Sequence, residues 1–196
     1  VLLTHMTAAG REAARQLYGP LERVRLAWLP YDYPSAARRF LARYQPSLGI
    51  ILETEIWPNF LDACSKAGLP VLLANARMSE RSARGYALVA SLAHRALAKF
   101  SAIAAQSDAD AQRLVRLGAP AERLSVIGNL KFDVPVPAGA QALAHTLRQR
   151  AGARKVLLAA SLREGEEDLL LDAMRDAGGL ALNALLLIVP RHPQRF

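Results

Sequence analysis

Short apolar runs alternate with segments of helical periodicity along almost the whole chain, and this alternation restricts the fold more than any other feature. The runs are four to six residues long and rich in Val, Ile, Leu and Ala, as expected for buried strands. Strands that alternate with helices form parallel sheets with right-handed crossovers, and helices then cover both faces of each strand. The sequence therefore predicts an α/β protein built from Rossmann-like parallel sheets.

The predicted elements cover most of the chain. Strands are expected at residues 1–4, 24–29, 48–52, 71–74, 102–105, 124–127, 155–160 and 184–189. Helices are expected at residues 8–18, 34–44, 57–67, 80–98, 108–118, 139–151 and 164–177. Ser79 and Ser107 stand where N-caps are expected, and Gly68 and Gly118 stand where helices should end.

A proline-rich segment, VPVPAG at residues 134–139, divides the chain. Two prolines and a glycine within six residues cannot continue a helix or a central strand. Six strands precede this segment, enough for one complete sheet, and the strand at 155–160 opens a second sheet. We expect a Rossmann-like domain at 1–134, a linker with a connecting helix at 135–152, and the start of a second Rossmann-like domain at 153–196.

The composition narrows the class of protein further. The 196 residues are 52% hydrophobic, which suits a globular protein with a buried core, and no apolar run approaches the roughly 20 residues of a membrane-spanning helix. The single cysteine, Cys64, excludes a disulfide framework, and no Cys/His spacing matches a metal-ligand set, so we expect no metal site. Because the chain starts within a strand-like segment and stops just after another, we interpret it as a fragment of a longer protein.

The charge distribution favours an anionic partner. The net charge is +8, and residues 1–100 hold 13 Lys and Arg against 7 Asp and Glu. A basic half-chain suits nucleic acid, an acidic membrane surface or a phosphorylated substrate, although an arginine-rich solvated surface has the same composition. The helix at 80–98 has two matching interpretations, an ordinary amphipathic surface helix or a face that rests on anionic lipid.

Polar residues that follow the predicted strands are the candidates for chemistry, because ligands bind beyond the carboxyl ends of parallel strands. Glu53 is the first polar residue after the run GIIL, so we expect it to be partly desolvated and to act strongly on nearby charge. Glu55 is either a second site residue or a group that approaches the N-terminus of the next helix. Lys131 either stabilises a leaving phosphate or is an exposed loop lysine, and Arg11 follows the first strand.

Two segments of the second domain suit a phosphorylated ligand. SLREGEE is a strand-to-helix turn in which Ser161, Gly165 and Glu166 stand near a helix start, where unpaired N–H groups attract anions. It is not a Walker loop, and its acids can equally be first-turn residues that the helix dipole favours. PRHPQRF places Pro190 and Arg191 after the next strand, where a guanidinium can bind phosphate through two hydrogen bonds.

Eight motifs together resemble a known family. In chain order they are THMTAAGR, LPYDYP, ETEIWPN, ANARMSERSARGY, AAQSDADAQR, GNLKFD, SLREGEE and PRHPQRF. With this order and spacing, nearly the whole chain resembles the bacterial 3-deoxy-D-manno-octulosonic acid (Kdo) transferases of lipopolysaccharide synthesis. The combination of ETEIWPN with NARMSERS is the most specific part of the resemblance.

The resemblance implies a GT-B glycosyltransferase, with two Rossmann-like domains that face a cleft, and no cofactor. The donor is then CMP-Kdo, the acceptor is lipid IVA, and the location is the cytoplasmic face of the inner membrane. By resemblance, Glu53 and Lys131 stabilise the transition state of an inverting transfer, and Pro190 and Arg191 contact CMP. The remaining candidates for substrate binding are Arg11, Glu55, Ser161, Gly165 and Glu166.

The resemblance also marks what this chain lacks. The general base, the first strand with its loop, and a membrane anchor are expected outside the chain, which should leave the chain alone inactive. Arg163 stands where the family pattern leads us to expect histidine, so we assign no proton transfer to that turn.

Two other classes of protein compete with this interpretation. Other GT-B enzymes, such as a lipid A disaccharide synthase or a sugar-nucleotide epimerase, share the expected fold but should lack ETEIWPN with NARMSERS. A basic nucleic-acid-binding module also fits the charge. We expect no nucleic acid partner, because the sequence does not interleave aromatic and basic residues for base stacking.

Overall fold

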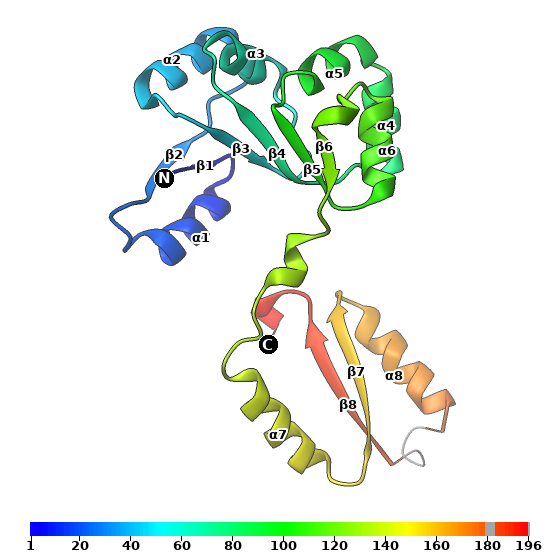
Figure 1. Ribbon diagram of the computed structural model, residues 1–196. Helices are drawn as coiled ribbons and strands as arrows, with labels where there is room; N and C mark the ends of the chain where they lie inside the picture. The colour runs from blue at the N-terminus through cyan, green and yellow to red at the C-terminus, as the bar shows by residue number, and fades with distance from the viewer. Residues whose placement is uncertain (179–182, 196) are drawn as a thin grey trace. The chain divides into compact units, whose positions relative to one another are not determined.

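The computed structural model describes residues 1–178 and 183–195. It divides into two compact units, Val1–Val134 and Pro135–Phe196, and in each of them strands alternate with helices (Figure 1). All eight predicted strands are present, with ends within two residues of the expected positions. Phe196, the last residue of the PRHPQRF motif, lies outside the described residues.

The elements follow the predicted order. The strands are β1 (Leu2–His5), β2 (Arg25–Trp28), β3 (Gly49–Leu52), β4 (Val71–Ala76), β5 (Ala102–Ala105), β6 (Leu124–Val126), β7 (Lys155–Leu162) and β8 (Ala184–Pro190). The α-helices are α1 (Ala8–Tyr18), α2 (Pro34–Tyr44), α3 (Pro58–Lys66), α4 (Glu80–Ala87), α5 (Ala90–Leu97), α6 (Asp108–Arg116), α7 (Ala140–Ala151) and α8 (Glu166–Asp176). Short 3₁₀ helices are η1 (Ala121–Arg123), η2 (Leu130–Asp133) and η4 (Pro193–Arg195).

The six strands of the first unit form two parallel sheets, so the prediction of one complete six-stranded sheet is wrong. One sheet pairs β1 with β2, and the other has the order β3-β4-β5-β6. Among the described strands, β1 and β3 each have one edge without a neighbour. A run of apolar residues predicts a strand, but it does not specify which strand lies beside it.

The core of the first unit surrounds β4 and β5. Its largest fully buried side chains are Phe100, Leu61, Leu73, Met78, Leu97, Ile103 and Leu114. The expectation that every strand is covered on both faces holds for β4 but not for β3, where Ile50 is 60% and Leu52 57% exposed. The strand β3 is the outer strand of its sheet, and its alternating burial shows that one of its faces is left exposed by the described elements.

The helix predicted at 80–98 is two helices, α4 and α5, separated at Leu88 and Val89. Val89 has φ −123° and ψ 39°, which is not helical, and Gly85 just before the break has low helix propensity. The predicted N-caps are confirmed, since Ser79 accepts from the Ser82 N–H and Ser107 from the Asp110 N–H. The predicted ends of α3 and α6 are also confirmed, because a glycine in the left-handed region follows each helix.

The second unit has one parallel pair, β7 with β8, together with α7 and α8. The connecting helix predicted at 139–151 is α7, and it belongs to this compact unit. Most of β7 is exposed, including Leu158 at 60%, so this strand also departs from the expected covering of both faces. Two strands and two helices cannot enclose a core as complete as that of the first unit.

Candidate active site

The candidate residues of the first unit follow three of its strands. Glu53 and Glu55 come directly after β3, Lys131 lies in η2 after β6, and Arg11 lies in α1 after β1. Because β3, β4, β5 and β6 are parallel and hydrogen-bonded in that order, their carboxyl ends share one edge. Glu53 and Lys131 therefore belong to the loops of a single sheet edge, whereas Arg11 belongs to the separate β1–β2 pair.

The backbone of Glu53 is fixed by a hydrogen bond to the neighbouring strand. Its N–H donates to the carbonyl oxygen of Ala74 at 3.0 Å, and its φ of 62° lies in the left-handed region that residues other than glycine seldom adopt. The side chain is exposed, so the expectation that Glu53 is partly desolvated is wrong for this chain. The reason is that β3 is an outer strand, and no described element covers the residue that follows it.

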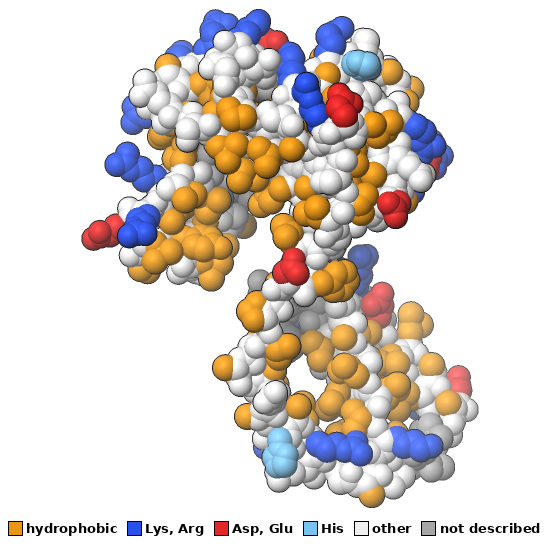
Figure 2. All heavy atoms as spheres, in the orientation of Figure 1, with side chains coloured by type: hydrophobic (Ala, Val, Ile, Leu, Met, Phe, Trp, Pro, Cys, Tyr) orange, Lys and Arg blue, Asp and Glu red, His pale blue; other side chains and the backbone are white. Residues whose placement is uncertain are grey.

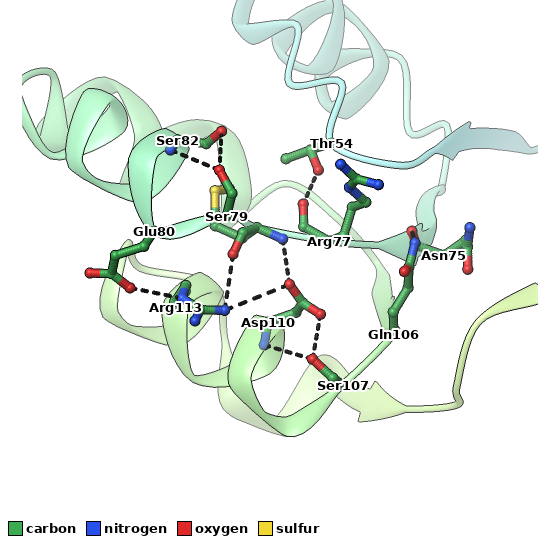
Figure 3. A network of polar contacts seen from close by, with 11 residues as sticks. Thr54, Asn75, Arg77, Ser79, Glu80, Ser82, Gln106, Ser107, Asp110 and Arg113 are labelled. Atoms are coloured by element: carbon green, nitrogen blue, oxygen red, sulfur yellow. Dashed lines mark hydrogen bonds and ion pairs between the residues drawn. The ribbon is translucent and has the colours of Figure 1, made fainter. Parts of the chain in front are cut away.

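The rest of the ETEIWPN segment is tied to its surroundings. The Thr54 hydroxyl donates to the backbone carbonyl of Arg77, which joins the loop after β3 to the loop after β4 (Figure 3). Trp57 Nε1 donates to Glu55 Oε2 at 3.0 Å, so the Glu55 carboxylate is held by the indole. This contact places the Glu55 carboxylate beside Trp57, the N-cap residue of α3, but the first backbone N–H groups of that helix donate to another residue.

Asp32 caps that helix instead. Its carboxylate oxygens accept from the backbone N–H groups of Asn59 (3.1 Å) and Phe60 (2.7 Å) in the first turn of α3. Asn59 Nδ2 donates in return to the Asp32 carbonyl oxygen at 2.8 Å. The LPYDYP loop thus fixes the start of α3. Sequence reasoning missed Asp32, and its position between two tyrosines near prolines is the only local signal of a constrained loop.

A polar network fixes the NARMS loop after β4 (Figure 3). Asp110 Oδ1 accepts from the buried Met78 N–H at 2.7 Å, and the second oxygen of Asp110 accepts from the Ser107 hydroxyl. Arg113 donates to the Met78 carbonyl oxygen at 3.2 Å and to Glu80 Oε2 at 2.9 Å, and this ion pair lowers the pKa of Glu80. These bonds hold the NARMS loop, whose Arg77 carbonyl oxygen accepts the bond from the Thr54 hydroxyl, in a fixed conformation.

Lys131 stands on a short turn. Asn129 caps η2 by accepting from the Lys131 N–H at 3.0 Å, and Leu130 N–H donates to Asn75 Oδ1 at 3.2 Å. The Lys131 side chain is exposed, and its ammonium has no hydrogen-bond or ion-pair partner among residues 1–178 and 183–195. A cation in that state is free to meet an anionic ligand at the sheet edge.

Arg11 is held against an aromatic ring. Its guanidinium carbon lies 4.9 Å from the centroid of the Trp28 ring at the end of β2. Arg11 Nε is buried and finds no hydrogen-bond partner within the described part of the chain. This geometry restrains Arg11 beside the β1–β2 sheet and leaves it a donor for a ligand there.

In the second unit, the candidate residues lie at the ends of β7 and β8. Ser161, with φ 64°, is near the end of β7, and Pro190 ends β8. Gly165, with φ 86°, precedes α8, and Glu166 Oε2 accepts from the Arg163 N–H at 2.8 Å. The Glu166 carboxylate is thus already engaged at the start of the helix.

A cationic pocket lies at this end of the second unit. It has a volume of about 380 Å³ and is lined by Arg163, Glu164, Arg191, His192 and Arg195. Arg195 Nη2 also lies 2.7 Å from Glu167 Oε1. Three guanidinium groups around one pocket suit a phosphate or carboxylate ligand. Arg195 was missed by sequence reasoning, although it belongs to the same PRHPQRF motif as Arg191.

Another groove of the first unit lies away from these residues. It has about 750 Å³ and runs between the outer surfaces of α2 and α3, and none of the predicted site residues lines it. Basic side chains are spread over the visible face of the first unit and do not gather into one stripe (Figure 2). Within residues 1–178 and 183–195, no group of three or more His, Cys, Asp or Glu could hold a metal ion. No helix in the described ranges is long and apolar enough to cross a membrane.

The first unit coincides with a known sequence family. The family described as 3-deoxy-D-manno-octulosonic-acid transferase (kdotransferase) matches residues 1–134. The chain belongs to the Kdo transferase family. Its similarity to whole members of the family extends through the second unit.

Two Kdo transferases illustrate this similarity. The chain is 41% identical to 3-deoxy-D-manno-octulosonic acid transferase of Bordetella pertussis over 205 residues, which cover 100% of this chain and 46% of that protein. It is 34% identical to the enzyme of the same description from Haemophilus influenzae, with the same two coverages. The chain therefore spans about half the length of the Kdo transferases that it matches.

Solved structures confirm the predicted α/β fold of Rossmann-like parallel sheets and its GT-B type. A UDP-GlcNAc 2-epimerase from Neisseria meningitidis superposes with a TM-score of 0.58 at 13% identity, covering 99% of this chain and 58% of that one. HepE from Anabaena, solved with UDP, superposes with a TM-score of 0.57 at 16% identity, covering 96% and 61%. At these identities the likeness concerns the fold alone.

Proposed function

We propose that the protein carrying this chain transfers Kdo from CMP-Kdo to lipid IVA, with inversion, at the cytoplasmic face of the inner membrane. The observation that carries the proposal is the position of Glu53 and Lys131 on loops of one sheet edge within the region that matches the family. The proposal takes the donor from the family, and a lipid acceptor agrees with the basic first half of the chain.

The proposed reaction develops opposite charges on the sugar and on the leaving phosphate. A hydroxyl of the acceptor attacks the anomeric carbon of Kdo, the bond from that carbon to the CMP phosphate oxygen breaks, and a general base outside this chain takes the hydroxyl proton. Attack from the face opposite to the phosphate inverts the configuration. Positive charge then develops on the sugar and negative charge on the leaving phosphate, and these are the charges that the site must stabilise.

Glu53 and Lys131 suit these two charges. The Glu53 carboxylate can face the developing cation on the sugar, and the unpaired Lys131 ammonium can stabilise the departing phosphate. Arg191, Pro190 and the arginine-lined pocket of the second unit suit the CMP portion of the donor. Ser161 and Gly165 border the same strand-to-helix turn and are proposed to contact the donor as well. Substrate binding is also proposed for Glu55, Glu166 and Arg11. The carboxylates of Glu55 and Glu166 would act by holding the conformation of their loops.

The division of the chain follows the same proposal. By this proposal residues 1–134 are the acceptor-side domain without its first strand and loop. Residues 135–196 form one compact unit, in which the connecting helix α7 precedes the start of the CMP-sugar-binding domain. Among the described strands, β1 and β3 each have one edge without a neighbour, which agrees with a further strand in this domain. With the general base absent, the chain alone should not catalyse transfer.

Transfer of labelled sugar by the full-length protein tests this function. We expect product from CMP-Kdo and lipid IVA and none from UDP-GlcNAc, and Lys131→Ala should lower turnover at least about 100-fold. Transfer from UDP-GlcNAc instead would favour the other GT-B enzymes. Binding of DNA or RNA that falls steeply with salt, without sugar transfer, would favour the nucleic-acid module.

A further inference from the structure

Asn75 combines two unfavourable features. Across residues 1–178 and 183–195 it is the only polar residue whose side chain is buried, with 6% of its surface exposed. Its backbone has φ 53°, in the left-handed region that side chains avoid and that asparagine tolerates better than most. A buried amide and a left-handed backbone both cost free energy, so the contacts of Asn75 must offset them.

Those contacts join the end of β4 to the segments that follow β5 and β6. Asn75 Oδ1 accepts from the Leu130 N–H at 3.2 Å, and the Asn75 carbonyl oxygen accepts from Gln106 Nε2 at 2.9 Å (Figure 3). The residue before it, Ala74, accepts the Glu53 N–H at 3.0 Å. Because a backbone N–H can only donate, the Leu130 contact fixes which end of the Asn75 amide is the oxygen.

The turn that carries Lys131 depends on this bond. Within the described ranges, Leu130 N–H to Asn75 Oδ1 is the only hydrogen bond that joins residues 128–134 to the body of the first unit. Apolar burial does not hold the turn either, since Phe132 is 88% and Leu130 44% exposed. Removal of the Asn75 amide should therefore release the turn and leave the rest of the sheet edge in place.

We infer that Asn75 is a positioning residue for sugar transfer: it holds the Lys131 turn at the sheet edge that carries Glu53. Asn75 acts through Lys131, and it need not touch the substrate. The inference rests on the proposed function for its effect on turnover, while its effect on the turn follows from the contacts alone.

Three variants of the full-length protein distinguish the effect of the Asn75 side-chain amide from the effect of its backbone conformation. Asn75→Gly removes the amide and accepts the left-handed φ without strain, and Asn75→Asp keeps an acceptor oxygen at the same place. Gln45 is exposed, has φ 42° and ends α2, so Gln45→Gly makes the matched change away from the site. Far-ultraviolet circular dichroism should be the same for all three.

Hydrogen exchange measures the anchor directly. In Asn75→Gly the Leu130 amide should exchange at least about tenfold faster, because its partner is gone, while amides of β4 and β5 keep their protection. Asn75→Asp should stay near wild type, and so should Gln45→Gly. Unchanged protection of the Leu130 amide in Asn75→Gly would overturn the inference, whether or not the protein transfers sugar.

Kinetics then test the route through Lys131. Asn75→Gly should lower kcat about tenfold or more through misplacement of the ammonium, with the KM for CMP-Kdo within about twofold of wild type. The double variant with Lys131→Ala should be no slower than Lys131→Ala alone. Multiplied losses in the double variant would contradict the inference, because Asn75 would then act by another route. A wild-type protein that transfers no Kdo would refute the proposed function and leave the exchange result to decide the role of Asn75.

Discussion

The backbone N–H of Glu53 donates a 3.0 Å hydrogen bond to the carbonyl oxygen of Ala74, and this bond holds Glu53 in a left-handed conformation at the end of β3. The exposed carboxylate makes no contact that the fold needs within the described ranges. Position and backbone at Glu53 are thus set by the sheet, and the side chain is available for function.

Glycine at position 53 should separate stability from activity. Glu53→Gly removes a left-handed cost of about 1–2 kcal/mol and adds a backbone entropy cost of about 0.5–1 kcal/mol, so the free energy of unfolding should equal that of wild type or exceed it by up to about 1.5 kcal/mol. Kdo transfer by the full-length protein should fall on the order of 100-fold or more, because the group that we propose to stabilise developing charge is lost. Urea unfolding and a turnover assay measure the two effects.

Glutamine provides the matched test of charge at the same position. Glu53→Gln should also cut transfer severely with little effect on folding, while Glu122→Gln, an exposed carboxylate in η1, should change neither. Turnover of Glu53→Gln equal to wild type would remove Glu53 from the mechanism.

Asp32 should contribute to stability through the first turn of α3. Asp32→Ala leaves the N–H groups of Asn59 and Phe60 without their acceptor and should lower the free energy of unfolding by about 1–2 kcal/mol. Asp32→Asn keeps one acceptor oxygen and should lose less. Glu22→Ala, at an exposed turn, is the control and should unfold like wild type in urea. Equal stability of Asp32→Ala and Glu22→Ala would show that water replaces the cap.

Acid should weaken the fold through Asp62. Hydrogen bonds from Lys66 and Lys99 lower the pKa of Asp62 from its ordinary 3.8 to about 2. A lowered pKa means that the contribution of this carboxylate is complete above about pH 4 and is lost as pH falls toward 2. Because Asp62 is 40% exposed, solvent screening should limit the effect to at most about 1 kcal/mol.

The variant Asp62→Asn checks the sign of this effect. The difference in unfolding free energy between wild type and Asp62→Asn should shrink as pH falls from 5 to about 2. Added salt should reduce it at pH 5, since Lys66 is largely exposed. A difference that is constant over this pH range would mean that the two ion pairs contribute nothing measurable.

Cys64 should be unreactive while the protein is folded. It is fully buried in α3, and burial raises the pKa of its thiol to about 11. Because the thiolate is the reacting form and the sulfur is shielded from solvent, Ellman's reagent should react at least about 100-fold more slowly with the native than with the urea-unfolded protein. Rapid reaction without denaturant would mean that α3 opens readily.

The sequence predicts the elements of this fold better than their arrangement. Runs such as GIIL and VLLA predict strands locally. Ser79 and Ser107 predict helix starts, because an N-cap side chain accepts from an N–H group only three residues away. The division into two sheets depends on which strands lie side by side. No run of apolar residues encodes that choice by itself.

The candidate site, like the fold, can be predicted from the sequence only in part. Glu53 and Lys131 can be found from sequence because each follows a strand, and ligands bind at such ends. Asp32 and Asn75 cannot, because they bind backbone N–H groups 27 to 55 residues away. The exposure of Glu53 also differs from the prediction, since an apolar run shows neither which strand is outermost nor what covers it.

The unpaired edges of β1 and β3 have a practical consequence for anyone who purifies this chain. Within residues 1–178 and 183–195 no strand lies beside these edges, so their main-chain donors and acceptors lack strand partners, and Ile50 and Leu52 of β3 have exposed apolar side chains. Strands of neighbouring molecules can pair with such edges through main-chain hydrogen bonds. Self-association that grows with protein concentration should therefore accompany the isolated chain, and a longer polypeptide that supplies a strand for these edges should remain monodisperse.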